Sequence, residues 1–440
     1  MFKRLSAVLL AVLLLLSTAY AASIAVDFAD TAALIDSEGT ELIAPGAYSF
    51  IFALDADGTL FCGGSEVNGT YRYALLDGSG NRLTEQAYDM FFLEDGVVLF
   101  TQNGLYGAMT TSGNVLVEAS YTQLVSNGAG GFLAITTDCF DDQPDGLYLI
   151  DDEGNQTATG VRTLGTLNWF SGGMMPLLSA ENNLFGYVNA SGQWAVSPQF
   201  AYAGPFIGER ALASLSTGYG LIDLTGNWVL TPKYYSLTHE DEALAFAVER
   251  DGTAIGFDPE SCAEIFRIEG EEGDYYAAYD GVVQAFGTDA TRLYDYSGRL
   301  IHEGSAQASY ARGLNGQYIL TDGLWGSECC RLINADGTLS ETAWQSLFPL
   351  FTVDGKGYYG FMAFDVTAEY SEALGEEQYT WDTDSVRYGV VDESGATVLE
   401  ARYEEMSAAQ DGRLIVREGD VQGLIDVQGN WVYQIDLARE

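Results

Sequence analysis

Acidic side chains are the groups in this 440-residue chain most able to do chemistry, because 63 residues are Asp or Glu and only two are His. One acidic position recurs: an Asp stands three residues before a Gly, as in Asp223 with Gly226 and Asp426 with Gly429. A carboxylate at such a fixed place can bind Ca²⁺ or serve in acid–base catalysis. It can also accept backbone N–H groups and close a tight turn, with the Gly in the left-handed conformation.

The variation between copies favours the turn. Asn replaces the Asp in two copies and Thr in one, and these side chains accept the same backbone hydrogen bonds. Thr110 stands three residues before Gly113 in the copy that has Thr. We therefore predict structural turn roles for Asp36, Gly39, Asp77, Gly80, Asp151, Gly154, Asn189, Gly192, Asp223, Gly226, Asp295, Gly298, Asn334, Gly337, Asp392, Gly395, Asp426 and Gly429.

Other acidic groupings match known sites less well. The stretch from Asp55 to Glu66 has the length of an EF-hand loop, but Leu60 stands where that loop needs Gly. Carboxylate pairs can hydrolyse glycosides, and the densest groups are 240–242 and Glu376 with Glu377. We interpret both groups as solvated acidic loops.

Nucleophilic catalysis has no signature in the sequence. There is no Gly-x-Ser-x-Gly elbow, and only His239 and His302 are available as imidazole bases. We expect His239 to lie in a solvated turn and His302 in a strand. No Gly-rich loop leads into a helix, so a phosphate-binding loop is not indicated. The sequence therefore predicts no catalytic residues.

Aromatic residues that fall outside the repeated pattern are candidates for binding. Exposed aromatic rings on a β-scaffold stack on sugars or anchor peptides. Trp381 is the strongest candidate, because it lies in an acidic stretch between two copies of the pattern. The binding residues that we propose from sequence are Trp381, Trp344, Glu376 and Glu377; the remaining tryptophans outside the pattern are Trp169 and Trp325.

The elements that must position these residues are short strands. The repeated pattern is an apolar pair, an Asp, two variable residues, a Gly, a polar residue and a second apolar pair, which is typical of a strand, a turn and a returning strand. It occurs about eleven times, and most copies lie 33 to 41 residues apart. A further apolar strand usually follows each copy. We predict an all-β fold of tandem antiparallel meanders of three or four strands, as propeller-like blades in one or two propellers or as an open superhelical array.

The clearest copies carry a family resemblance. The pattern is Tyr-Gly, two apolar residues, Asp, two variable residues and Gly, then one residue and Trp, with Pro and an aromatic further on, as around Trp228. The copy that ends in Trp194 begins Phe-Gly and has Asn for Asp, and the copy that ends in Trp431 begins Gln-Gly and lacks the Pro. This pattern resembles the WG-repeat (KWG) proteins of bacteria over most of residues 29–436. The copies at Tyr106 and Tyr388 keep the Tyr-Gly but lack the Trp. The resemblance implies a repeat scaffold and no particular ligand.

The chain divides into four segments by composition. Residues 1–21 have a basic start, an apolar run from Leu5 to Leu16 and a small-x-small ending at Ala21, which is typical of a secretory signal peptide. Residues 22–340 form the main repeat array and 341–385 an acidic insertion or linker within it. Residues 386–440 hold the last repeats. We expect cleavage after Ala21, a secreted or extracytoplasmic protein, and no membrane insertion afterwards.

Net charge limits the partners. The formal charge of −44 disfavours binding to nucleic acid and to anionic lipid. Calcium is the one cofactor that this charge makes conceivable. The five cysteines form no CxxC pattern, so their pairing stays open.

The leading hypothesis is an exported, non-enzymatic scaffold for a protein or glycan ligand. Two alternatives stay open: a propeller-type carbohydrate-active enzyme that uses acidic residues, and a calcium-dependent adhesion module. The breaks in the pattern, at Pro259 and around Trp381, are where we expect function to lie.

Overall fold

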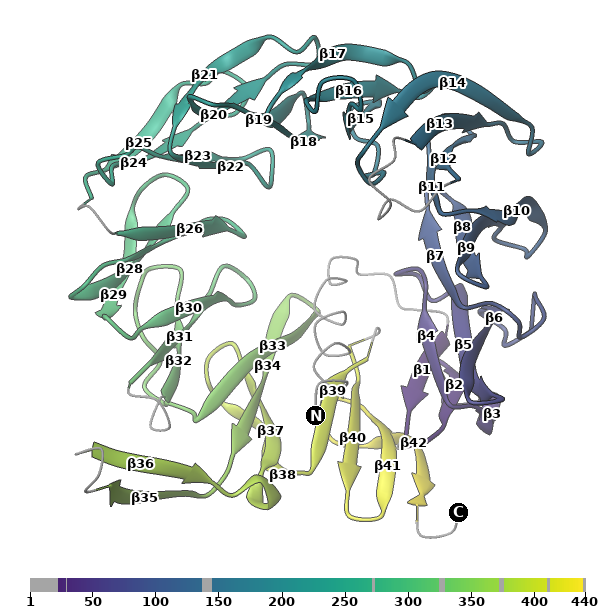
Figure 1. The fold of residues 1–440 in the computed structure, drawn as a ribbon. Helices are drawn as coiled ribbons and strands as arrows, with labels where there is room; N and C mark the ends of the chain where they lie inside the picture. Colours follow the sequence, from purple (N-terminus) through teal and green to yellow (C-terminus); the bar gives the residue numbers. More distant parts are fainter. Residues whose placement is uncertain are drawn as a thin grey trace. The chain divides into compact units, whose positions relative to one another are not determined.

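The computed structural model describes residues 23–28, 30–136, 145–270, 274–323, 329–371, 376–409 and 412–437. These residues form eleven antiparallel sheets of three or four strands, one separate two-stranded hairpin and a single turn of 3-10 helix, η1 (Thr383–Ser385). The predicted all-β fold of tandem meanders in propeller-like blades is confirmed. Figure 1 shows the sheets following one another in chain order.

Contacts divide the chain into two compact units. Unit 2, residues 87–303, contains six sheets. Their strands are β7 (Met90–Glu94), β8 (Val97–Gln102), β9 (Leu105–Thr110), β10 (Val115–Tyr121), β11 (Gln123–Ser126), β12 (Phe132–Ile135), β13 (Asp145–Ile150), β14 (Gln156–Thr163), β15 (Met174–Leu178), β16 (Phe185–Asn189), β17 (Trp194–Phe200), β18 (Tyr202–Ile207), β19 (Arg210–Leu215), β20 (Gly218–Ile222), β21 (Trp228–Tyr234), β22 (Ser236–Thr238), β23 (Ala245–Val248), β24 (Ala254–Phe257), β25 (Glu264–Ile268), β26 (Tyr275–Tyr279), β27 (Val282–Phe286), β28 (Ala290–Asp295) and β29 (Leu300–Ser305).

Unit 1 combines residues 1–86 with residues 304–440. Five sheets and the hairpin belong to it. Their strands are β1 (Ser23–Asp27), β2 (Ala32–Asp36), β3 (Glu41–Tyr48), β4 (Phe50–Ala53), β5 (Leu60–Val67), β6 (Thr70–Asp77), β30 (Ser309–Arg312), β31 (Tyr318–Asp322), β32 (Cys329–Ile333), β33 (Ser346–Val353), β34 (Lys356–Ala363), β35 (Val366–Ser371), β36 (Glu376–Trp381), β37 (Arg387–Asp392), β38 (Thr397–Tyr403), β39 (Glu405–Ala408), β40 (Leu414–Glu418), β41 (Val421–Ile425) and β42 (Trp431–Asp436).

The repeated pattern forms the last hairpin of a blade, and its Tyr-Gly pair has a steric reason. In β20–β21 the register shifts between Tyr219 and Leu221, so the returning strand bulges against Gly220. A Cβ on Gly220 would lie 2.3 Å from the carbonyl oxygen of Leu230. The equivalent Gly423 has a carbonyl oxygen 2.2 Å away. Only Gly fits this close approach of two backbones.

Adjacent blades bury their apolar faces against each other. One core cluster combines Tyr187, Val196 and Phe200 of the β15–β17 sheet with Phe206 and Ile222 of the next sheet. Phe200, the aromatic residue that ends its returning strand, has an exposed fraction of 0%. Because a three- or four-stranded meander cannot bury its own face, this stacking between blades supplies the core.

The first and last sheets also pack together within unit 1. Ile24 and Val26 of β1 share a core cluster with Leu424 and Tyr433 of the last sheet. The hydroxyl of Tyr433 donates to Glu41 Oε1 at 2.8 Å. The two ends of the described array are therefore joined by both apolar and polar contacts.

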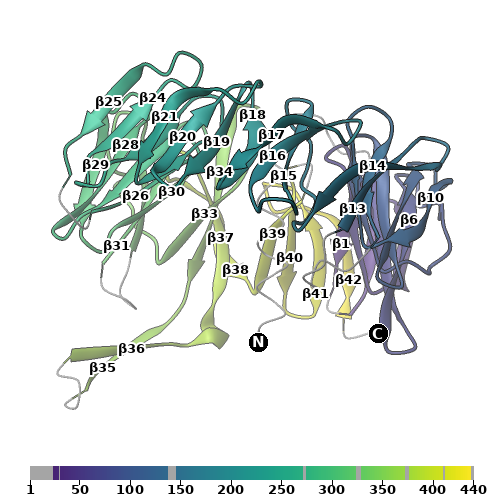
Figure 2. The ribbon, with the colours of Figure 1, turned by 45° about the horizontal axis from the view of Figure 1, so that its top comes forward.

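The acidic insertion is shorter than its predicted range of 341–385. Strands β33 and β34 lie inside that range, yet they belong to a blade with β37 and β38. Only the β35–β36 hairpin with its flanking residues interrupts this blade. In both views the hairpin extends away from the blade that carries it (Figure 2).

Candidate functional site

The repeated acidic side chain is used by its own turn. Asp223 Oδ1 accepts the backbone N–H groups of Thr225 at 2.9 Å and Asn227 at 3.0 Å, and Gly226 has φ of +81°. The Gly226 N–H also donates to the Asp223 carbonyl. This is an Asx turn closed by a left-handed Gly. The same pair of side-chain bonds occurs at Asp36, Asp77, Asp151, Asn189, Asp295, Asp392 and Asp426.

In the two remaining turns, other side chains accept the backbone N–H groups. Thr110 Oγ1 accepts the Asn114 N–H at 3.1 Å. In the copy that starts at Asn334, the carboxylate of Asp336 accepts the Thr338 N–H at 3.0 Å. The turn therefore also forms with a Thr hydroxyl, or with an Asp two residues further along the chain, as the acceptor.

Hydrogen bonding favours the charged form of the Asp36 and Asp151 carboxylates. The N–H of Thr40 is the largest cause that lowers the pKa of Asp36, and the side chain of Asn155 is the largest that lowers the pKa of Asp151. A general base with a lowered pKa is a weak proton acceptor. Among the described residues, no three His, Cys, Asp or Glu side chains are grouped so as to hold a metal ion.

The turn at Asp392 differs from the others, because it is tied to neighbouring strands. Asp392 has an exposed fraction of 8%, and its Oδ2 lies 2.8 Å from Lys356 Nζ. Burial raises the pKa of Asp392, but hydrogen bonds from Lys356, Ser394 and Ala396 outweigh it and bring the pKa to about 2. Next to it, Glu393 Oε2 accepts the Asn315 side-chain amide at 2.7 Å.

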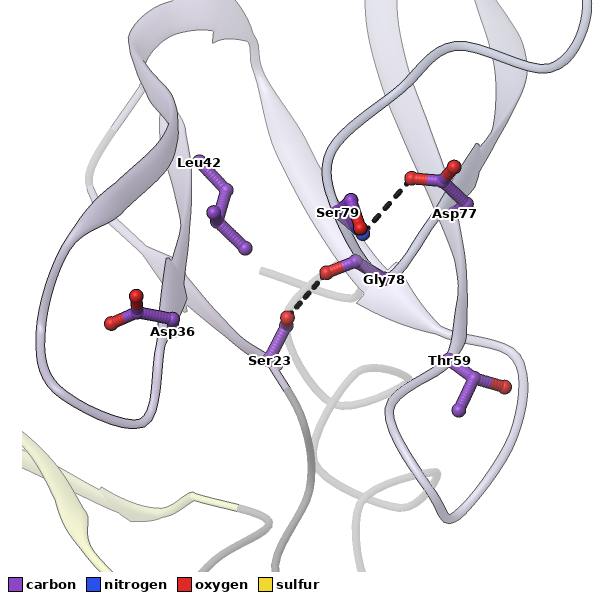
Figure 3. Close-up of a pocket in the computed structure, with 7 residues that line it drawn as sticks. All are labelled: Ser23, Asp36, Leu42, Thr59, Asp77, Gly78 and Ser79. Carbon is purple, nitrogen blue, oxygen red and sulfur yellow. Dashed lines mark hydrogen bonds between the residues drawn. The ribbon is translucent and has the colours of Figure 1, made fainter.

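A cavity of about 480 Å³ opens in unit 1, where the turns of the β1–β3 and β4–β6 sheets meet (Figure 3). Ser23 Oγ donates to the Gly78 carbonyl across it. Both carboxylates that line it, those of Asp36 and Asp77, accept the amides of their own turns. Its lining is Ser23, Asp36, Leu42, Thr59, Asp77, Gly78 and Ser79. Sequence reasoning missed it, because no local pattern links residues so far apart in the chain.

The binding residues predicted from sequence differ in their exposure in the structure. Trp381 is exposed by 45%, and its ring centroid lies 5.3 Å from that of Phe364. Trp344 is buried in a core cluster with Leu347 and Tyr359, so its ring is not on the surface. The backbone of Glu376 and Glu377 lies in β36, but their side chains fall outside the described part of the structure, as do the whole of Trp325 and Cys139.

Two exposed side chains on the hairpin were missed by sequence reasoning. Val366 has an exposed fraction of 37% and Tyr370 one of 66%. The signal for them was the alternation of Val366, Ala368 and Tyr370 in an otherwise polar segment. In the β35–β36 ladder Val366 pairs with Trp381 and Ala368 with Tyr379.

The expected solvated turn around His239 is wrong. His239 is 7% exposed, and its Nε2 lies 3.4 Å from the Ile207 carbonyl. Burial lowers its pKa and favours the neutral form. His302 lies in β29, as expected. The Asp241 carboxylate accepts the Tyr296 hydroxyl at 3.1 Å, so this acidic segment is partly used for packing.

The second break in the pattern, at Pro259, is a contact between blades. The Arg210 guanidinium donates to the carbonyl oxygens of Pro259 at 3.1 Å and Glu260 at 2.8 Å. Asp258 Oδ1 accepts the Ser261 N–H at 2.7 Å within the same turn. The altered turn is thus held by the adjacent sheet and leaves no exposed aromatic group.

The cysteines form no disulfide among the described residues. Cys62 and Cys330 are buried, and Cys262 and Cys329 are partly exposed. Burial raises the pKa of the Cys62 thiol, which makes it a poor nucleophile. No described helix has the length and apolar character needed to cross a membrane. The predicted signal segment, 1–21, lies outside the described residues.

Comparison with known proteins gives a family match for three segments. Residues 185–215, 219–252 and 388–421 match a family described as WG containing repeat. A comparison with curated protein sequences gave no match.

Several solved structures resemble the chain in part. A computationally designed protein, Ika8, has 13% identity and a TM-score of 0.32, over 67% of this chain and 95% of its own. BamB from Moraxella catarrhalis has 11% identity and a TM-score of 0.31, over 61% and 92%. A eukaryotic initiation factor has 12% identity and a TM-score of 0.42, over 65% and 86%.

Proposed function

Three segments of this chain are WG-containing repeats, and from that premise we propose that the protein is an exported, non-enzymatic scaffold that binds a protein or glycan partner. The observation that carries the proposal is the use of the acidic side chains. In eight of the repeated turns the Asp or Asn side chain accepts two backbone N–H groups, so the most regular feature of the sequence maintains the blades.

Two further features support a binding role. Stacked blades give a broad surface on which loops and insertions are presented without disturbing the core. The β35–β36 hairpin is such an insertion, and it carries exposed Tyr370 and Trp381. Export is supported by the composition of residues 1–21 alone.

A binding survey tests the proposal. Purified residues 22–440 are applied to arrays of glycans and of extracellular proteins, and the same protein is assayed on a panel of glycosides and peptides. We expect saturable binding without turnover. Hydrolysis that is lost in Glu240→Gln or Asp241→Asn would instead identify an enzyme.

Export and calcium dependence are tested separately. The full chain, tagged at its C-terminus, is expected in the extracytoplasmic fraction with Ala22 as its first residue by mass spectrometry. Retention of residues 1–21 would contradict cleavage. Thermal unfolding with and without a calcium chelator is expected to give the same midpoint, and a drop with chelator would favour the calcium-dependent adhesion module.

A further inference from the structure

The β35–β36 hairpin has one apolar face and one polar face. In an antiparallel ladder, alternate residues share a face, together with the residues paired to them. Val366 pairs with Trp381, Ala368 with Tyr379 and Tyr370 with Glu377, so these residues share one face, on which all but Glu377 are apolar or aromatic. Thr367, paired with Thr380, lies on the other.

The apolar face is exposed where a core strand would be covered. Val366, Tyr370 and Trp381 have exposed fractions of 37%, 66% and 45%. A two-stranded hairpin with an exposed apolar face is marginally stable in water, and burial of that face stabilises it. The hairpin is therefore a surface whose stability rises when a partner covers it.

The base of the hairpin is fixed to its blade. The side chain of Gln345 donates to the Phe364 carbonyl at 2.7 Å and accepts the Phe364 N–H at 2.8 Å. The Asp365 N–H donates to Ser385 Oγ at 2.8 Å. Because the base is held at several points, the apolar face is presented in a defined direction, which lowers the entropy lost on binding.

Both strands have an open edge. Within the described residues, β35 and β36 pair only with each other, and neither forms a ladder with a third strand. An open edge presents a row of backbone donors and acceptors to an incoming extended segment. The hairpin thus offers backbone hydrogen bonds at its edge and an apolar strip on its face.

Charge selects the partner. Between Lys356 and Arg387 the sequence has seven acidic and no basic residues. With a net charge of −44, a second copy of this chain is repelled from the hairpin, as is a nucleic acid or an anionic lipid. A segment that alternates basic with apolar residues complements both the acidic field and the apolar face.

We propose that the β35–β36 hairpin is a docking site for an extended, basic segment of a partner protein, which adds to the hairpin as a third strand. The proposal rests on the proposed binding function and names its partner class. Backbone hydrogen bonds supply the pairing, Tyr370 and Trp381 contact the apolar side chains of the segment, and the acidic residues attract its cations.

A peptide-binding experiment tests the proposal on the chain from residue 22 to residue 440. The probe is a fluorescent nine-residue peptide that alternates arginine with valine. Two control peptides carry glutamate in place of arginine, or N-methyl groups on every second residue, which removes backbone donors. We expect saturable binding of the first peptide only, and binding that weakens with salt.

Matched variants locate the site. Tyr370→Ala and Trp381→Ala are expected to weaken binding about tenfold or more each. Tyr235→Ala and Trp169→Ala remove side chains with exposed fractions of 65% and 61% outside the hairpin, and we expect no change in affinity. Equal loss in all four variants, or equal binding of the N-methylated peptide, would overturn the proposal.

The outcomes separate this inference from the proposed function. If hairpin variants keep full affinity for a partner found in the array survey, the proposed scaffold function is supported and the proposed docking site is wrong. Loss of glycan binding in Trp381→Ala, or a dimer that these variants dissolve in sedimentation, would assign the hairpin to another occupant and also overturn the proposal.

Discussion

The repeated Asp–Gly turns and the β35–β36 hairpin are both reversals between antiparallel strands, but their side chains are used in opposite ways. In the turn at Asp223 the carboxylate bonds two amides of its own loop, and the strands beside it are buried between blades. In the hairpin, the polar base is fixed and the apolar side chains are exposed. The repeated turns therefore maintain the scaffold, whereas the hairpin, which departs from the repeat, provides an exposed apolar surface.

The largest difference should appear when an aromatic residue is truncated in each region. Phe200 is fully buried between two blades, so Phe200→Ala should lower the free energy of unfolding by about 3–5 kcal/mol through lost contacts and a cavity. Trp381→Ala removes a larger but exposed ring and should change it by less than about 0.5 kcal/mol.

Urea unfolding followed by tryptophan fluorescence and circular dichroism measures both variants. Circular dichroism is needed, because Trp381→Ala also alters the fluorescence. Equal losses in the two variants would show that the hairpin belongs to the core, and would remove the distinction between scaffold and surface.

A second, smaller effect concerns the Gly of the Tyr-Gly pair. In Gly220→Ala the added Cβ would meet the Leu230 carbonyl at 2.3 Å, so the strands must separate, at a cost of about 1–3 kcal/mol. Gly204 in β18 is the control, because a Cβ there meets its nearest atom only at 3.6 Å. We expect Gly204→Ala to change stability by less than about 0.5 kcal/mol, and a similar cost at both sites would contradict the steric explanation.

A third effect depends on pH, and it concerns the turn beside the hairpin. The pKa of Asp392 is about 2 in the folded chain, below its ordinary 3.8, so its ion pair with Lys356 stabilises the fold above pH 3.8. That contribution is lost as the pH falls through about 2. Lys356→Met should therefore destabilise the fold near neutral pH, by less than Gly220→Ala does, and the difference from wild type should shrink between about pH 4 and pH 2.

The other lysine after residue 21 provides the control. Lys233 pairs with Glu249 at 3.4 Å and is largely exposed, so Lys233→Met should cost less than Lys356→Met near neutral pH. Urea unfolding at intervals from pH 6 to pH 2 measures both. A cost for Lys356→Met that stays constant down to pH 2 would show that Asp392 is not the group involved.

The repeats could be read from sequence because each signal is local. The Asp-to-Gly spacing defines a turn within four residues, and the apolar pairs around it define two strands. The number of repeats, the strand count and the turn residues follow from those signals. The reason for the Tyr-Gly pair could not be predicted from the sequence. The carbonyl group that leaves no room for a Cβ at Gly220 belongs to Leu230 on the paired strand, and no sequence pattern indicates the bulge that brings it close.

The candidate site was predictable only in part. Trp381 and Trp344 were both selected because they fall outside the repeated pattern, and Trp381 was preferred because it lies in an acidic segment. Trp381 is exposed, but Trp344 packs with Tyr359 in the core. Composition cannot separate the two, because exposure depends on whether a neighbouring sheet covers the side chain. For the same reason β33 and β34 were assigned to the insertion, although they form one sheet with β37 and β38.

The smallest effect on stability should come from the largest deletion. The Asp382 N–H donates to the Asp365 carbonyl at 3.0 Å, so the two ends of the hairpin are already adjacent. Replacing residues 366–381 with a short Gly-Ser linker therefore closes the chain without moving β34 or β37. If the hairpin is surface and not scaffold, this excision should leave the unfolding midpoint within a few degrees of wild type while removing peptide binding. The deletion removes sixteen residues, whereas Phe200→Ala removes part of one side chain. If the deletion lowered stability more than Phe200→Ala, the hairpin would belong to the scaffold, and the roles assigned to the two regions would be wrong.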